Sequence, residues 1–149
     1  MHLTHFSDYS LRVLIHLGLN AGRQTSIHEI AVAYDISEAH LMKVVHGLAK
    51  HGYVASTRGR GGGLKLARPP EQIPIGAVLR DTEDDMALTE CFSSGNTCPI
   101  AGPCGLQSIL REALDAFLAV LDRHTLDDLL WPHGMALAAR LGIDLQPRA

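Results

Sequence analysis

Three stretches of hydrophobic residues at helical spacing occupy the first third of the chain. The first begins near Thr4 or Ser7, residue types that cap helix N-termini, and ends at Gly18. The second opens with residues 26–29, Ser-Ile-His-Glu, whose first and fourth residues fit a capping box. The third follows a further capping residue, Ser37, and its apolar positions are Leu41, Val44, Val45 and Leu48. The second and third helices, joined by a tight turn, are typical of a helix-turn-helix motif.

Gly52 can stop the third helix. After it, the spacing of hydrophobic residues changes from that of a helix to that of a strand. Residues 53–57 are rich in strand formers and residues 64–67 alternate, so the glycine-rich residues 58–63 predict a hairpin tip. Glycine-rich loops also bind phosphate in nucleotide enzymes, but here no G-K-[ST] sequence is present and no helix follows the glycines. The hairpin is therefore predicted to be the wing of a winged helix-turn-helix domain.

The second half of the chain predicts a short helix near residues 73–81, an acidic loop to Pro103 and a long helix. From Cys104 to His124 the apolar residues form a wide stripe, and Pro103 suits the first helical position. Such a helix is roughly 31 Å long and carries more apolar surface than one small domain covers. We therefore expect it to form a subunit interface, with packing on the first helices as the alternative. Thr125 is expected to cap a short terminal helix.

These elements predict a fold that is mostly α with a small β-hairpin. Its parts are a winged helix-turn-helix domain at 1–80, a cysteine-containing loop at 81–103, and a dimerisation helix with the C-terminal tail at 104–149. A content of 46% hydrophobic and 19% charged residues is that of a folded domain. The pattern of a signal peptide and long uncharged apolar runs are both missing, so we expect a cytoplasmic protein without a membrane partner.

Charge is distributed unevenly along the chain, although the formal net charge is only -3. Residues 39–70 contain no Asp or Glu, and their basic residues are Lys43, Lys50, Arg58, Arg60, Lys65 and Arg68. A basic segment in an acidic protein is the electrostatic footprint of a phosphate-binding surface, with a solvated face as the alternative. The expected DNA contacts are Ser37, His40, Lys43 and Lys50 on the third helix, with Arg58, Arg60, Gly61 and Gly62 at the wing tip.

All cysteines of the chain lie close together, at Cys91, Cys98 and Cys104. In a cytosolic protein, an odd and clustered set indicates metal binding or redox chemistry more than a disulfide framework. Thiolates select zinc or iron–sulfur clusters, and the spacing matches the paired cysteines of zinc fingers poorly. No family signature of nucleophilic catalysis surrounds any cysteine, so we do not expect an enzyme. Spacing leaves the fourth ligand of a cluster open among Asp8, His5, Glu83, Asp84, Asp85, Glu90 and Gln107.

Three sequence motifs together carry a resemblance to a known family. They are residues 40–53, HLMKVVHGLAKHGY, residues 58–67, RGRGGGLKLA, and the pair Glu90-Cys91-Phe92 and Cys98-Pro99-Ile100 ahead of Cys104. Over about residues 1–130 the chain resembles the NsrR family of nitric-oxide-sensing repressors, which belong with the IscR regulators to one group of dimeric winged-helix transcription factors. The resemblance implies a homodimer that binds an inverted-repeat operator in double-stranded DNA and responds to nitric oxide.

The resemblance also implies one [4Fe-4S] cluster per subunit, with Cys91, Cys98 and Cys104 at the positions of the family's ligands. Asp8 stands at the place of the aspartate that completes the cluster from the other subunit, and Arg12 is placed to orient or pair with it. In IscR-like members a histidine completes a [2Fe-2S] site where this chain has Gln107. The alternatives are an IscR-like [2Fe-2S] redox or cluster-supply regulator, and a zinc- or thiol-dependent binding protein or redox enzyme without a DNA target.

Overall fold

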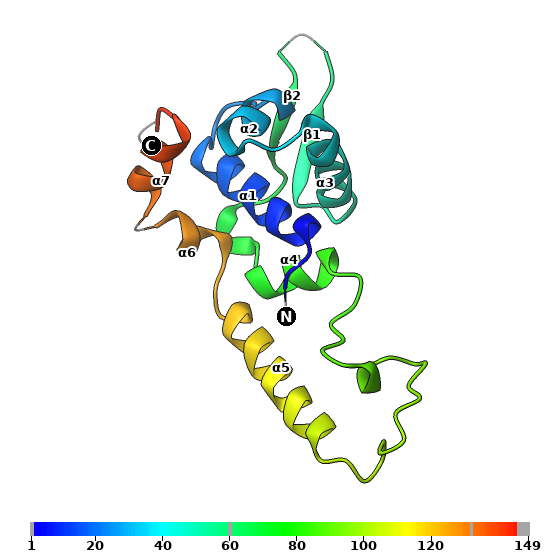
Figure 1. Cartoon of the computed structure of the whole chain (residues 1–149). Coiled ribbons are helices and arrows are strands. Elements are labelled where there is room, and N and C mark those ends of the chain that lie inside the picture. Colours follow the sequence, from blue (N-terminus) through cyan, green and yellow to red (C-terminus); the bar gives the residue numbers. More distant parts are fainter. Residues whose placement is uncertain (1, 60, 132, 146–149) are drawn as a thin grey trace.

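The computed structural model describes residues 2–59, 61–131 and 133–145. Its helices are α1 (His5–Leu19), α2 (Ile27–Tyr34), α3 (Glu38–Lys50), α4 (Ile75–Thr82), α5 (Leu106–Asp122), α6 (Leu126–Leu130) and α7 (Gly134–Leu141). Two strands, β1 (Val54–Thr57) and β2 (Gly63–Leu66), and two 3-10 turns, η1 (Pro70–Gln72) and η2 (Glu90–Phe92), complete the set. Helix α5 and the segment before it project from the body formed by the other elements (Figure 1). The fold is mostly helical with one hairpin, as predicted.

The first three helices begin where their capping residues predict. Thr4 and Ser37 each accept a hydrogen bond from a backbone N–H in the first turn of α1 and α3. Ser26 and Glu29 form a reciprocal capping box at the start of α2. Between α2 and α3, Asp35 takes a left-handed conformation with φ of 52°, which turns the chain sharply into the helix-turn-helix arrangement.

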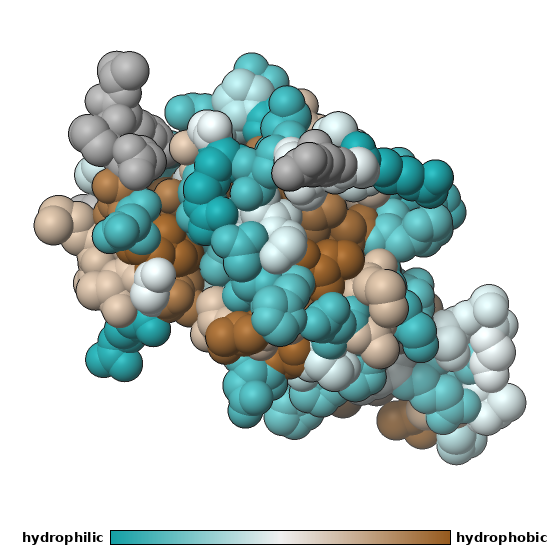
Figure 2. Space-filling view, turned by 90° about the horizontal axis from the view of Figure 1, so that it is seen from above, coloured by the Kyte–Doolittle hydropathy of each residue, from teal (hydrophilic) through white to brown (hydrophobic). Residues whose placement is uncertain are grey.

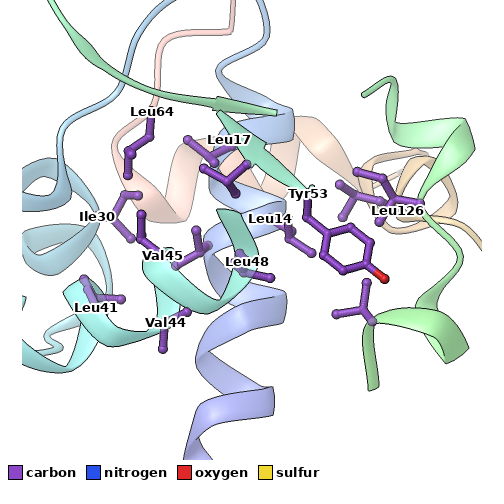
Figure 3. Close-up of a cluster of buried hydrophobic side chains, with 14 of the residues drawn as sticks. Leu14, Leu17, Ile30, Leu41, Val44, Val45, Leu48, Tyr53, Leu64 and Leu126 are labelled. Atoms are coloured by element: carbon purple, nitrogen blue, oxygen red, sulfur yellow. The ribbon is translucent and has the colours of Figure 1, made fainter. Parts of the chain in front are cut away.

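One hydrophobic core joins α1, α3, the hairpin and α6 (Figure 3). Leu14 of α1, Leu48 of α3 and Leu126 of α6 are fully buried in it. Burial of a side chain of this size stabilises the fold by about 1.5–3 kcal/mol. The core therefore fixes the position of α3 relative to the rest of the body, while the outer face of α3 stays exposed.

The hairpin is attached to the helix-turn-helix motif as well as to itself. Strands β1 and β2 pair antiparallel, from Val54 with Leu66 to Thr57 with Gly63. A bridge of two backbone hydrogen bonds also joins β2 to Thr25, just ahead of α2. The wing is thus held at a fixed angle beside α3.

Seen from the hairpin end, the molecule is mostly hydrophilic, with apolar side chains in separate patches (Figure 2).

The long helix is shorter than predicted at both ends, since α5 covers Leu106–Asp122 and not 104–124. A turn precedes it, because the backbone N–H of Cys104 donates to the carbonyl of Ile100, and Pro103 lies within that turn. At the other end, the chain leaves the helix two residues early and hydrogen-bonds the first residue of α4. The tail also contains α7, a helix that the sequence pattern did not predict.

Helix α4 holds the C-terminal end of α5 through a charged pair. The guanidinium of Arg80 donates to both carboxylate oxygens of Asp122, at 2.7 and 2.6 Å. These hydrogen bonds lower the pKa of Asp122. Gly76 lies so close to this carboxylate that a Cβ there would collide with it. The backbone N–H of Ile75 also donates to the carbonyl of His124 at 2.9 Å. This end of α5 is therefore fixed to the winged-helix body.

The rest of α5 is largely exposed to solvent. None of its residues is buried, and Leu106, Ile109 and Val120 are 55%, 63% and 45% exposed. The helix lies beside α4 and extends away from α1, α2 and α3 (Figure 1). Its apolar stripe is thus not covered by the first helices within the described part of the chain. No helix in the described ranges is long and apolar enough to cross a bilayer.

His16 makes the stability of the fold depend on pH. The residue is 2% exposed, and burial first, with Arg23 second, lowers the pKa of its ring below 6.5. As pH falls below 6.5, the unfolded chain takes up a proton that the folded chain excludes, so acid favours unfolding. We expect the free energy of unfolding, measured by urea titration, to fall over this interval less steeply in His16→Leu than in the parent. His46→Leu, on the exposed face of α3, is the matched control, and equal slopes in parent and His16→Leu would contradict the assignment.

Candidate functional site

The exposed face of α3 carries the residues that were predicted to contact DNA from this helix. Ser37 caps its N-terminus, His40 and Lys43 lie in its first two turns, and Lys50 lies in its last turn. Lys43 and Lys50 are about 10 Å apart along the axis and have no ion-pair partner among the residues described. Two free cations and a capping hydroxyl therefore face solvent along one helix.

The wing tip carries Arg58, which is exposed, and glycines that its turn requires. Gly61 has a φ of 81°, a conformation that residues with a side chain rarely adopt. Gly62 lies so close to the carbonyl oxygen of Thr57 that a Cβ there would collide with it. The predicted contact residue Arg60 lies outside the described residues. The glycines thus allow a tight tip beside the exposed Arg58.

Substituting Gly62 by alanine should open this turn, because its new Cβ meets a backbone oxygen that cannot move aside. We expect affinity for DNA, the predicted partner of this surface, to fall about tenfold, or ~1.4 kcal/mol, in a fluorescence-anisotropy titration, with little change in thermal unfolding. Ser56→Ala, at an exposed position of β1, is the matched control and should bind as the parent does. Unchanged affinity of Gly62→Ala would show that the wing does not contribute to binding.

Arg68 was counted with the basic segment, but the structure gives it an internal role. Its guanidinium donates to the carbonyl oxygens of His51 and Gly52, at 2.9 and 3.1 Å, and lies 4.5 Å from the ring centroid of Tyr53. The side chain thus closes the C-terminal end of α3, where its Nε and Nη2 atoms are engaged. Sequence analysis missed this role, which depends on how the hairpin folds back on the helix.

The three cysteines are free thiols on the segment between α4 and α5, and all are half-buried: Cys91, Cys98 and Cys104. Local hydrogen bonds shape this segment. The carboxylate of Glu90 accepts from the backbone and the hydroxyl of Thr97, at 2.9 and 2.6 Å. Gln107 of α5 donates from its side-chain amide to the carbonyl of Cys91 at 2.6 Å. Gln107 therefore ties the cysteine segment to the free end of α5.

The thiols fit an iron–sulfur cluster in kind and number, but they are not gathered in this conformation. Within the described ranges, no three His, Cys, Asp or Glu side chains are placed to hold one metal ion. Residues 83–105 contain no buried side chain and only short turns, so the segment can rearrange without disturbing the core. Sulfur donors of this kind suit iron–sulfur clusters.

Asp8 lies on α1 and is paired with Arg12. The Nε and Nη2 atoms of Arg12 contact the two carboxylate oxygens at 3.1 and 2.8 Å, which confirms the pairing expected from the sequence. Among the residues that the structure describes, Asp8 and the cysteines of the same chain do not form a group of three that could hold a metal ion. Close by, the carboxylate of Glu83 accepts from the backbone N–H of Thr4 at 2.8 Å. The start of the cysteine segment is thus tied to the helix that carries Asp8.

Comparison with known proteins identifies the family. Residues 3–132 match Rrf2, described as an iron-dependent transcriptional regulator. The chain belongs to the Rrf2 family. Among its Rrf2 relatives, the HTH-type transcriptional regulator NsrR of Bacillus subtilis (strain 168) is 52% identical over 132 residues, or 87% of this chain and 90% of that protein. NsrR of Geobacillus kaustophilus (strain HTA426) is 51% identical, with the same coverage.

Solved Rrf2 structures agree with the fold. T. potens IscR superposes with a TM-score of 0.73 at 27% identity, covering 91% of this chain and 90% of that one. The winged-helix fold and the similarity to NsrR regulators predicted from the sequence are therefore confirmed. Because its relatives are named as transcriptional regulators, this Rrf2 protein is a transcriptional regulator and not an enzyme.

Proposed function

We propose that the protein is a homodimeric repressor that senses nitric oxide through a [4Fe-4S] cluster, one per subunit. Cys91, Cys98 and Cys104 of one subunit and Asp8 of the other would hold the cluster. The observation that carries the proposal is the set of three free thiols beside the uncovered helix α5. The identity to NsrR regulators supports the choice of effector.

The uncovered stripe of α5 is the proposed dimer interface. Exposed apolar side chains such as Leu106 and Ile109 stabilise a soluble protein only when a partner covers them. The proposed ligand set requires that pairing of two copies of α5 brings α1 of one copy to the cysteine segment of the other. The division into parts at 1–80, 81–103 and 104–149 then corresponds to DNA binding, cluster binding and dimerisation.

On DNA, we assign α3 to the major groove, where its N-terminal residues meet base edges. Ser37, His40 and Lys43 would lie in the groove, and Lys50, Arg58, Arg60, Gly61 and Gly62 would contact the flanking backbone or minor groove. A dimer of this kind reads an inverted repeat whose half-site centres are about 34–36 Å apart, or a multiple of that. If Lys43 contacts phosphate, Lys43→Ala should lower the salt slope of binding by about one counterion.

Asp8 and Arg12 would set the response of the protein to nitric oxide. When bound, an iron–sulfur cluster supplies iron that reacts with nitric oxide. A carboxylate is a weaker ligand for such iron than a thiolate is, so Asp8 leaves the site open to exchange. The ion pair with Arg12, at 2.8 Å, gives Asp8 a second partner when it is not a ligand. Movement of Asp8 between these partners would shift α1, against which α3 packs.

Anaerobic purification followed by visible and Mössbauer spectroscopy tests the proposal. A brown protein with four irons per subunit that loses operator binding on adding nitric oxide agrees with it. Two irons per subunit would favour the alternative [2Fe-2S] regulator of redox state or cluster supply. A colourless protein that holds zinc, or one that binds no operator in any state, would overturn it.

A further inference from the structure

A cavity of about 300 Å³ lies between α1, α2 and the C-terminal end of α7. Its apolar wall consists of Val32, Ala33, Leu141, Gly142 and Ile143, and its polar groups are His16, Arg23, His28 and Glu29. The volume falls at the lower end of the roughly 300–1,000 Å³ of small-molecule sites. None of these residues has a role in the DNA surface or the cysteine segment.

His16 lines this cavity, and both of its ring nitrogens are buried with their hydrogen-bonding capacity unused. It is 2% exposed, and neither ring nitrogen has a hydrogen-bond partner among the described residues. Its ring neighbour is Tyr34, tilted at a centroid distance of 5.9 Å. Burial keeps the ring pKa below its ordinary value, so at neutral pH the imidazole is uncharged and offers one donor and one acceptor. A buried polar group without a partner destabilises the fold, and a bound molecule would supply the partner.

Beside His16, the cavity presents a fixed cation and a fixed anion. Arg23 Nη1 contacts Glu29 Oε1 at 2.8 Å, and Arg23 Nε donates to Asn20 at 2.8 Å. Arg23 Nη2 has no hydrogen-bond partner within the described ranges. A hydrogen bond from the backbone of Ser26, assisted by Arg23, lowers the pKa of Glu29 to about 2, so this carboxylate is charged. The charges balance, and a ligand with one group of each sign is complementary to them.

We propose that this cavity binds a free α-amino acid with an apolar side chain. The carboxylate of the ligand lies on Arg23 Nη2, and a turn of the buried His16 ring toward the cavity lets a ring nitrogen donate a hydrogen bond to it. Its ammonium lies on Glu29, and its side chain packs against the wall that includes Leu141 and Ile143. The ligand would clamp α2, the first helix of the helix-turn-helix motif, to α1 and α7. The site is separate from the cysteines, so its failure and that of the proposed cluster are distinguishable.

Calorimetric titration of the purified full-length protein tests the proposal with L-leucine, L-isoleucine, L-valine, L-methionine and L-phenylalanine in turn. We expect at least one to bind and to raise the thermal unfolding midpoint. For that amino acid, the N-acetyl and the amide derivatives should bind at least tenfold more weakly, because each lacks one charged group. Binding by none of the five, or equal binding of the derivatives, would overturn the proposal.

Variants locate the binding in the cavity. His16→Leu and Arg23→Gln should each lower the affinity for the amino acid at least tenfold, while Arg111→Gln, on α5, leaves it unchanged. Ile143→Trp, at a half-buried position near the chain end, should block the cavity and remove binding even if His16→Leu does not fold. Affinity equal to that of the parent in folded Ile143→Trp would place the ligand elsewhere and overturn the assignment.

Discussion

Cys98→Ala is expected to abolish cluster retention and to lower operator affinity by about 10²-fold, or ~2.7 kcal/mol of coupling. Three thiols are available for the cluster, and all lie on one segment, so the loss of any one leaves too few sulfur donors. Iron and sulfide analysis after anaerobic purification reports the cluster. Fluorescence anisotropy with an operator duplex, at one fixed salt concentration, reports the affinity.

Two further variants make this result specific. Ser94→Ala changes an exposed residue of the same segment and should retain both cluster and affinity. Asp8→Ala removes the weakest of the proposed ligands, so we expect a retained cluster with altered reactivity toward nitric oxide. Equal operator affinity of the cluster-free and the cluster-loaded protein would contradict the proposed coupling between cluster and DNA binding.

Leu48→Ala should lower the free energy of unfolding by about 2–5 kcal/mol. Leu48 is fully buried on α3, in the same cluster as Leu14 of α1 (Figure 3), so truncation leaves a cavity at the joint of these two helices. Urea unfolding of the parent and the variant measures the difference. Met42→Ala, on the same helix but 55% exposed, should change stability by no more than about 0.5 kcal/mol. Similar losses in both variants would contradict this account of the core.

The helix starts were predictable from sequence because their determinants are local. The capping box of Ser26 and Glu29 lies within four residues of chain and appears in the structure as predicted. The predicted ends of α5 were wrong. Contacts with a distant segment, such as that of Arg80 with Asp122, decide where the helix stops. The turn that contains Pro103 delays its start. Helix α7 was not predicted although the tail is amphipathic, because no side-chain cap marks its start and its buried residues are the small Gly134 and Ala138.

The residues of the candidate site were also predictable only in part. The cysteines and the exposed basic residues of α3 were identified by residue type and spacing. The role of Arg68 was not, since its acceptors lie at His51 and Gly52, across the hairpin. The cavity around His16 was missed because its lining comes from α1, α2 and the end of α7. Such a set is recognisable only once the chain has folded.

The attachment of α5 gives the molecule the mechanics of a lever. Its pivot is the joint of Arg80 with Asp122, and its far end is tied to the cysteine segment through Gln107. A helix of 17 residues is about 26 Å long, so a tilt of roughly 10° at the pivot moves the far end by roughly 4 Å. Because this end of α5 is fixed to α4, displacements of a few ångströms at the far end correspond to small rotations of α4 and of the winged-helix body. A rigid arm of this length transmits angle between the two ends of the protein without refolding any part of the body.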